Sequence, residues 1–396
     1  MNKKTEPTKK IGIGNILTVV CFLTVMSQLP QIVSLGLSSL IAQVVWILFF
    51  GMVVYIKRDI LIIKHFLISI TFGVVYLIFV LLVSLISGTS YYTTGLFSVI
   101  VLSMFILFLS TQIGHDISSK DLINCGKAYI LASLILAIDL YIFAYRGIDI
   151  SNQQYQYASK NSAGVILMTA AIIAVMTDWR KLKKIEAIIN IVCIAIFVVM
   201  IFIMKTRAMI VCVPVVIALL IWKAPMGKIF KTLLILLCVG SLIALQNEEV
   251  YDLVVNQIVF AGRKDNLDEM SSGRVNQWQH FGKYMEGNWI VGDGHTELES
   301  LILTAFVQCG ALMGTLIILY ALWPFLFSFV KVVRGDRSRE IFLLLLISTV
   351  YFIDAIFEQL APFGPGARCF YLWLILGILL SRSTKTEKER SLNYAR

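Results

Sequence analysis

Long runs of apolar residues recur along almost the whole sequence. Twelve of these runs approach or reach the roughly 17–25 residues that a helix needs to cross a bilayer. In the whole chain 58% of the residues are hydrophobic and 15% are charged, whereas a soluble domain has about 25% charged residues. One water-soluble core cannot hide so much apolar surface. The sequence therefore excludes a soluble enzyme and predicts an all-α polytopic membrane protein, with spans at residues 11–30, 35–56, 66–87, 95–113, 125–145, 161–177, 186–204, 208–222, 229–246, 301–330, 341–358 and 367–381.

The basic residues lie in short clusters between these runs. With twelve spans and a cytoplasmic N-terminus, 25 of the 34 Lys and Arg fall in cytoplasmic segments and nine fall outside, as the positive-inside rule predicts. Both termini are then cytoplasmic. This placement accounts for the net charge of +10 without nucleic acid as a partner. The seven cysteines lie in or beside apolar runs and form no CxxC pair, so we predict neither a disulfide framework nor a zinc site.

One predicted outer segment, residues 247–300, is much longer than the others. It separates nine helices in residues 1–246 from three helices and a basic tail in residues 301–396. Residues 250–260 are apolar enough to lie on the membrane, and residues 274–286 predict an amphipathic helix. Loops of this length are usually functional or disordered, and this one is not of low complexity. We therefore expect a large extracytoplasmic loop with amphipathic helices.

A second predicted outer loop, residues 146–160, is rich in tyrosine and amide side chains, including Tyr155 and Tyr157. Aromatic rings beside amides suit the faces and hydroxyls of sugars, and a hydrated loop has the same composition.

Two arginines attract attention because cations are disfavoured on the outer side. Arg207 follows Lys205 in a short turn between two apolar runs, and Arg274 opens the amphipathic helix that also contains Trp278. Alternatively, these cations are interfacial anchors whose side chains reach water, or they are solvated surface charges. Charges in or near the membrane are commonly functional, however. We predict that these cations meet an anionic ligand at the outer membrane surface.

Ionisable residues also gather near the last two predicted spans. Asp354 and Glu358 are four residues apart and share one helix face, and Arg368 follows a turn rich in proline and glycine. The pattern favours a structural ion pair between two helices over a pair of carboxylates for acid–base chemistry.

Of the four histidines, His295 is the best placed for chemistry. It lies in residues 292–297, a turn with two glycines just before a long apolar run. A histidine at the outer surface can accept a proton from a hydroxyl near neutral pH.

Several short motifs, taken in their order along the chain, resemble those of the O-antigen ligase and polymerase family (WaaL and Wzy types). Residues 272–278 resemble the family's GRxxxW start of a loop helix, and residues 288–295 and 308–314 resemble its glycine turn and its G-x-x-G step. Residues 206–208 look like its "SRga" turn, and residues 160–163 look like its "N-x-x-a" helix start. The resemblance covers the chain from Lys160 onward.

The resemblance implies a GT-C-like membrane glycosyltransferase, in a bacterial cytoplasmic membrane, that acts on undecaprenyl-diphosphate-linked oligosaccharides at the outer face. Arg207 and Arg274 would bind the diphosphate and stabilise it as the leaving group, and His295 would be the catalytic base. The family's histidine lies closer to the first glycine of the pair than His295 lies to Gly310. Glu299 occupies the corresponding place here, so Glu299 and Glu297 are alternative bases.

The predicted function is polymerisation of repeat units for a capsule, an O-antigen or an exopolysaccharide, without a metal or a cofactor. A chain-length regulator and a flippase would be partners. A ligase that passes the glycan to another acceptor has nearly the same sequence features, and a flippase for the same lipid is an alternative of another class. Internal repeats, which are typical of many transporters, are absent from the sequence. The expected substrate-binding residues are Lys205, Lys160, Asn161, Tyr155, Tyr157, Trp278 and Arg368.

Overall fold

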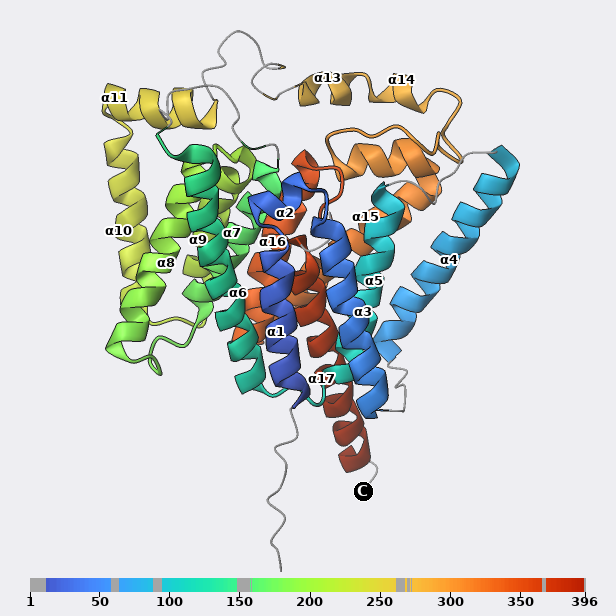
Figure 1. Ribbon diagram of the computed structural model, residues 1–396, viewed down its shortest axis with the longest axis horizontal. Coiled ribbons are helices and arrows are strands. Elements are labelled where there is room, and N and C mark those ends of the chain that lie inside the picture. Colours follow the sequence, from blue (N-terminus) through green and yellow to red (C-terminus); the bar gives the residue numbers. More distant parts are fainter. Residues whose placement is uncertain are drawn as a thin grey trace, which may run out of the picture.

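The computed structural model describes residues 12–57, 64–87, 95–147, 159–260, 273–364 and 368–394, together with positions 157, 268 and 271. Within these residues the regular structure is entirely helical (Figure 1). The helices are α1 (Ile13–Met26), α2 (Pro30–Ser34), α3 (Ser38–Lys57), α4 (Lys64–Ser87), α5 (Gly95–Ile113), α6 (Ser119–Leu140), η2 (Tyr141–Tyr145), α7 (Lys160–Met176), α8 (Lys184–Ile203), α9 (Arg207–Lys223), α10 (Lys228–Ala244), α11 (Glu248–Tyr251), η3 (Asp252–Val259), α13 (Arg274–Gln279), α14 (Phe281–Met285), α15 (Leu301–Val333), α16 (Arg339–Phe357) and α17 (Phe370–Tyr394).

Several of these helices have the length and the apolar composition that a membrane span needs. Seven in the described part of the chain are long and apolar enough: α3, α4, α5, α6 continued by η2, α8, α15 and α16. An eighth results if α10 and α11–η3, which are bent by 104°, form one broken span. The helices α1 and α7 and the first half of α17 are apolar but shorter. A helix satisfies its own backbone polar groups and is therefore stable in lipid, so the fold is that of an all-α membrane protein.

The outermost helices carry apolar side chains on their exposed faces. Leu242 of α10 is 66% exposed, Ile188 of α8 is 61% exposed and Leu81 of α4 is 60% exposed. In α10 no residue is buried. A soluble protein rarely exposes large continuous apolar patches. In Figure 1 α4 and α10 lie at opposite edges of the molecule, where such faces would contact lipid.

The core of the molecule is formed by α7, α16 and α17. Every residue from 163 to 174 in α7 is buried, and so is every residue from 370 to 381 in α17. The helix α16 packs against α7, α9, α15 and α17. A helix that is apolar all round is stable only when neighbours or lipid cover all its sides. The start of α7 and the end of α16 contribute residues to the candidate site.

The sequence predicts one continuous span at residues 301–330, but α15 is broken at Gly310. This residue has φ 72° and ψ 175°, a conformation that is readily accessible only to glycine. The break is where an earlier loop crosses α15: the Ala311 N–H donates to the Trp289 carbonyl at 2.8 Å. A Cβ at Gly310 would lie 2.2 Å from the Ile290 carbonyl oxygen. Periodicity alone does not reveal such a break, because apolar residues continue through it.

A second glycine makes the same crossing possible from the loop side. Gly292 has φ 77°, and a Cβ there would lie 2.3 Å from the Gln308 carbonyl oxygen. The adjacent Asp293 N–H donates to the Val307 carbonyl at 2.8 Å. The two glycine motifs of the sequence therefore meet in space, and they determine where the loop crosses α15.

We expect Gly310→Ala to destabilise the protein, because the methyl group would collide with the Ile290 carbonyl and alanine disfavours this backbone conformation. The cost is about 1–3 kcal/mol for the conformation alone. It should be measurable as a lower melting temperature of the purified protein in detergent. Gly240→Ala is the matched control, since Gly240 has open space around it in α10. Equal melting temperatures for the two variants would contradict the close crossing.

The segment between α10 and α15 contains short helices that lie across the ends of the long ones (Figure 1). The single amphipathic helix predicted for residues 274–286 is in fact two helices, α13 and α14, with a break at His280. Gly282 follows the break and has a low helix propensity. Met285 is fully buried against Leu298, Leu303 and Val307. Met285, at the end of the predicted apolar face, therefore anchors α14 to the start of α15, whereas Trp278 on the same face is 43% exposed.

Candidate functional site

The turn between α8 and α9 places Lys205 and its neighbours at one end of the bundle. Lys205 has φ 51°, the left-handed conformation that commonly ends a helix. Its N–H donates to the Phe202 carbonyl at 3.0 Å, and the Thr206 N–H donates to the Ile201 carbonyl at 3.3 Å. A Cβ at Gly164 would lie 2.8 Å from the Thr206 side chain. The turn therefore packs directly on α7, at a position that only glycine allows.

This packing brings cations from two parts of the chain together. The Lys160 ammonium, at the start of α7, lies 3.5 Å from the Lys205 carbonyl oxygen. The Lys205 side chain is buried, and Arg207 begins α9 two residues later. Cations gathered at one end of the bundle create a positive potential that attracts anions.

Arg274 begins α13 directly after Gly273, which has φ 83°. Its guanidinium is held in a fixed orientation: Nε and Nη2 donate to the Phe357 carbonyl at 3.2 and 2.9 Å, and Nη1 donates to the Ser271 carbonyl at 3.1 Å. Nη2 also lies 2.9 Å from Glu299 Oε2. The backbone of the α16 end thus positions the fork of Arg274, and Glu299 occupies the side where an anion would bind.

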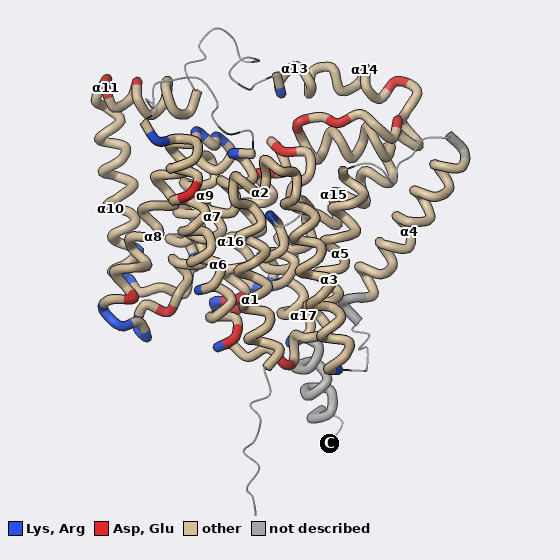
Figure 2. Tube along the Cα trace, in the orientation of Figure 1, with Lys and Arg blue, Asp and Glu red and all other residues tan. Residues whose placement is uncertain are grey.

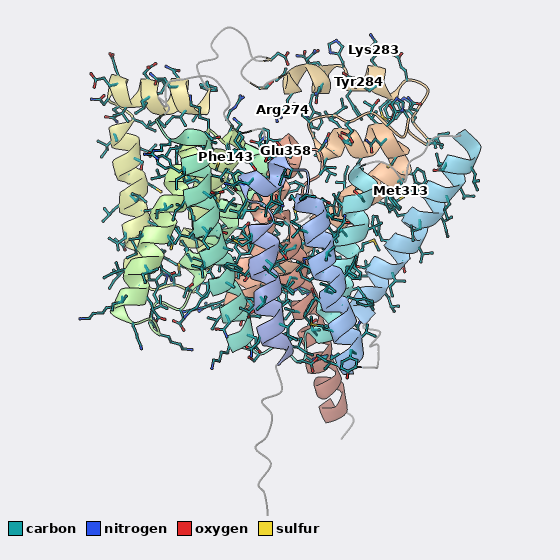
Figure 3. All side chains as sticks on the ribbon, in the orientation of Figure 1. Phe143, Arg274, Lys283, Tyr284, Met313 and Glu358 are labelled. Atoms are coloured by element: carbon teal, nitrogen blue, oxygen red, sulfur yellow. The ribbon has the colours of Figure 1, made fainter. Side chains whose placement is uncertain are left out.

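Glu358, which ends α16, connects the other parts of the site. Its Oε1 accepts a hydrogen bond from Asn161 Nδ2 at 2.6 Å and lies 3.9 Å from Arg274 Nη2. Its Oε2 lies 3.9 Å from Arg368 Nη1. Figure 3 shows Arg274 and Glu358 close together, with Glu358 on the side of the helix bundle. One carboxylate therefore links α7, α13 and α16.

Arg368 forms the buried ion pair that the sequence predicts. Its Nη2 lies 2.7 Å from Asp354 Oδ2, and its Nη1 donates to Ser162 Oγ at 3.1 Å. Arg368 is 1% exposed and Asp354 is fully buried. Arg368 thus contacts two carboxylates of the α16 end, and its role in binding substrate stays a prediction.

Arg274, Glu358 and the cations near the α8–α9 turn line a cavity of about 530 Å³, which we call the Arg274 cavity. Its size is typical of small-molecule sites, about 300–1,000 Å³. Four cations and two carboxylates contribute to its wall, and the remainder is largely apolar. The lining residues are Lys160, Asn161, Lys205, Arg207, Ala208, Val211, Val259, Phe260, Ser271, Arg274, Val275, Trp278, Glu299, Ile356, Phe357 and Glu358.

Most of the predicted site residues meet in this cavity. Both predicted arginines line it, and so do Glu299 and four of the predicted substrate-binding residues: Lys160, Asn161, Lys205 and Trp278. These residues come from four separate parts of the chain, at positions 160–161, 205–207, 274–278 and 299.

Other predicted site residues lie elsewhere. The His295 side chain is 75% exposed, its Nδ1 lies 2.8 Å from the Asp293 carbonyl oxygen, and it does not line the cavity. Glu297 accepts a hydrogen bond from Gln359 at 3.1 Å. Tyr157 is buried, and its burial raises the pKa of its hydroxyl. Tyr155 lies outside the described residues.

The sequence did not point to Glu358 as a cavity residue. Its spacing from Asp354 was informative, but it indicated only an ion pair. The contact between Arg274 and the Phe357 carbonyl could not be predicted either. Every residue has a backbone carbonyl, so the residue type does not show which carbonyl accepts a hydrogen bond.

In the described part of the chain, no three His, Cys, Asp or Glu side chains are grouped as metal ligands would be. In comparisons with known proteins, no family model matches the chain and no curated protein matches it.

Proposed function

We propose that this protein is a polymerase of undecaprenyl-diphosphate-linked oligosaccharides, which transfers a glycan from its lipid diphosphate to a sugar hydroxyl. The observation that carries the proposal is the Arg274 cavity, in which Lys160, Lys205, Arg207 and Arg274 converge beside apolar side chains. Such a wall suits a ligand with both a pyrophosphate and a hydrocarbon chain, because guanidinium groups pair with phosphate oxygens in a bidentate manner.

We further propose the membrane topology that this function requires. All twelve apolar segments would span a bacterial cytoplasmic membrane, including the shorter helices α1, α7 and α9 and the first half of α17. Both termini would be cytoplasmic, and residues 247–300 would lie outside. The positions of Lys and Arg, which gather toward the two ends of the helices in Figure 2, agree with this arrangement. The Arg274 cavity would then lie at the outer headgroup level, where a lipid-linked diphosphate is found.

In the proposed reaction, the diphosphate replaces Glu299 at Arg274 Nη2, which now lies 2.9 Å from that carboxylate. The hydroxyl oxygen of the acceptor sugar attacks the anomeric carbon, and the bond from that carbon to the diphosphate oxygen breaks. Undecaprenyl diphosphate leaves with the bonding electrons, and its new charge is stabilised by Arg207 and Arg274. One positioned donor of this kind contributes about 3–4 kcal/mol.

We propose that Glu299, released from Arg274, accepts the proton of the attacking hydroxyl. Glu299 lines the cavity and His295 does not. We therefore expect Glu299→Gln to lower the turnover rate by about 10²–10⁴-fold, the usual range for a general base. His295→Ala should leave the rate almost unchanged. A severe defect in His295→Ala with a mild one in Glu299→Gln would restore the histidine as the base.

The function is tested by incubating the purified protein, without nucleotide or metal, with lipid-linked units extracted from cells that lack it. We expect longer lipid-linked chains and one released undecaprenyl diphosphate for each new bond. If the units instead cross the membrane of sealed vesicles without being joined, the protein is a transporter and the proposal fails. Transfer only to an added non-lipid-diphosphate acceptor would identify a ligase.

A further inference from the structure

A second cavity lies at the opposite end of the helices from Arg274. It has a volume of about 600 Å³, and three turns border it: the one between α7 and α8, the one between α9 and α10, and the one between α15 and α16. We call it the Trp179 cavity. It shares no lining residue with the Arg274 cavity, so it is a separate site and nothing in the proposed reaction uses it.

The wall of the Trp179 cavity is strongly basic. Five cations line it, and Asp336 is its only carboxylate in the described part of the chain. Figure 2 shows charged residues gathered at this end of α8 and α10. The five cations are Arg180, Lys223, Lys231, Arg337 and Arg339.

The nearby carboxylates neutralise only part of this wall. Asp336 Oδ1 accepts a hydrogen bond from the Ser338 N–H at 2.9 Å, directly before the start of α16. Asp178 lies 2.9 Å from Arg339 Nη2; partial burial opposes ionisation, but the contact with Arg339 lowers the pKa of Asp178 overall. The five cations thus outnumber these two carboxylates. No described carboxylate forms an ion pair with Arg180 or Arg337, and a positive field remains.

Two tryptophans give the cavity an interfacial character. Trp222 stacks on Phe329 with ring centroids 6.2 Å apart, and the Lys223 ammonium lies 5.0 Å from its ring centroid. Trp179 donates its indole N–H to the Val175 carbonyl at 2.9 Å. Tryptophan beside lysine and arginine at helix ends is typical of the headgroup level of a membrane. Basic pockets between membrane helices at this level bind anionic head groups.

We propose that the Trp179 cavity binds a phosphate-bearing anion, with Arg180 and Arg337 as its main ligands. Both arginines are exposed at the mouth of the cavity, and each can form two hydrogen bonds to phosphate oxygens. Lys231 lies deeper, where its ammonium donates to the Ile221 carbonyl at 3.0 Å. The anion can come from the lipid leaflet or from solution, and the same guanidinium chemistry serves both.

The proposal is tested by calorimetric titration of the purified full-length protein in a neutral maltoside detergent. The probes are dihexanoyl-phosphatidylglycerol, dihexanoyl-phosphatidylcholine and inorganic pyrophosphate. We expect the first or the third to bind and Arg180→Gln/Arg337→Gln to weaken that binding by at least about tenfold, the effect of about 1.4 kcal/mol. The control Lys120→Gln/Lys184→Gln removes the same charge at exposed positions outside the cavity and should bind normally.

Binding of phosphatidylglycerol alone would identify a lipid head group as the ligand, and binding of pyrophosphate would identify a soluble phosphate compound. The proposal is overturned if neither anion binds more tightly than phosphatidylcholine, or if the control variant loses as much affinity as the arginine variant. Because transfer activity is not measured, failure of this test would leave the proposed function untouched, and the reverse also holds.

Discussion

Arg274→Ala is expected to lower the rate of chain elongation by about 10²–10³-fold, the loss seen when one preorganised donor to a developing anion is removed. The guanidinium is fixed by the Phe357 and Ser271 carbonyls, so it needs no reorganisation when the diphosphate arrives. Arg274→Lys should recover only part of the rate, because an ammonium keeps the charge but lacks the planar fork. Arg207→Ala should act in the same direction.

The measurement is elongation by purified variants, with the amount of folded protein checked by gel filtration. Lys283→Ala is the matched control: it removes a cation from the same segment, and Lys283 lies on the outer side of α14, away from Arg274 and Glu358 (Figure 3). If Arg274→Ala elongates at the normal rate, the diphosphate does not bind in the Arg274 cavity. If the Arg274→Ala variant fails to fold, the elongation rate of Arg274→Lys is compared with that of the wild-type protein instead.

The largest expected effect on stability is that of Arg368→Ala. It would leave Asp354 buried without its partner 2.7 Å away, and breaking a buried ion pair from one side costs about 3–5 kcal/mol. The variant should melt far below the wild-type protein or fail to accumulate. Asp354→Leu/Arg368→Met removes both charges and fills the space with apolar atoms. It should recover much of the stability, since such replacements are often neutral.

Thermal unfolding in detergent, followed by tryptophan fluorescence, checks both variants. A single Arg368→Ala variant that melts normally but no longer elongates chains would contradict the structural role. Arg368 would then be the substrate-binding residue that the sequence predicted.

The sequence alone determined the fold class and the positions of the helices. Apolar runs must become helices in lipid, because no water is present there to satisfy an open backbone. Every run that the sequence marked has a helix in the described structure, and α7 and α16 begin within two residues of the predicted bounds. The pairing of Arg368 with Asp354 was predictable too, since two buried opposite charges close in sequence have few other partners.

The tertiary structure decided what these helices bring together. The break at Gly310 depends on a loop backbone that crosses α15, and no local periodicity encodes that crossing. The break of the predicted amphipathic helix at His280 was also missed, because apolar residues recur with helical spacing on both sides of it. His295 and Glu299 are four residues apart in an irregular segment, so spacing could not tell which of them faces Arg274. Long-range packing settles that question, because the direction of a loop side chain depends on the neighbours that the whole fold supplies.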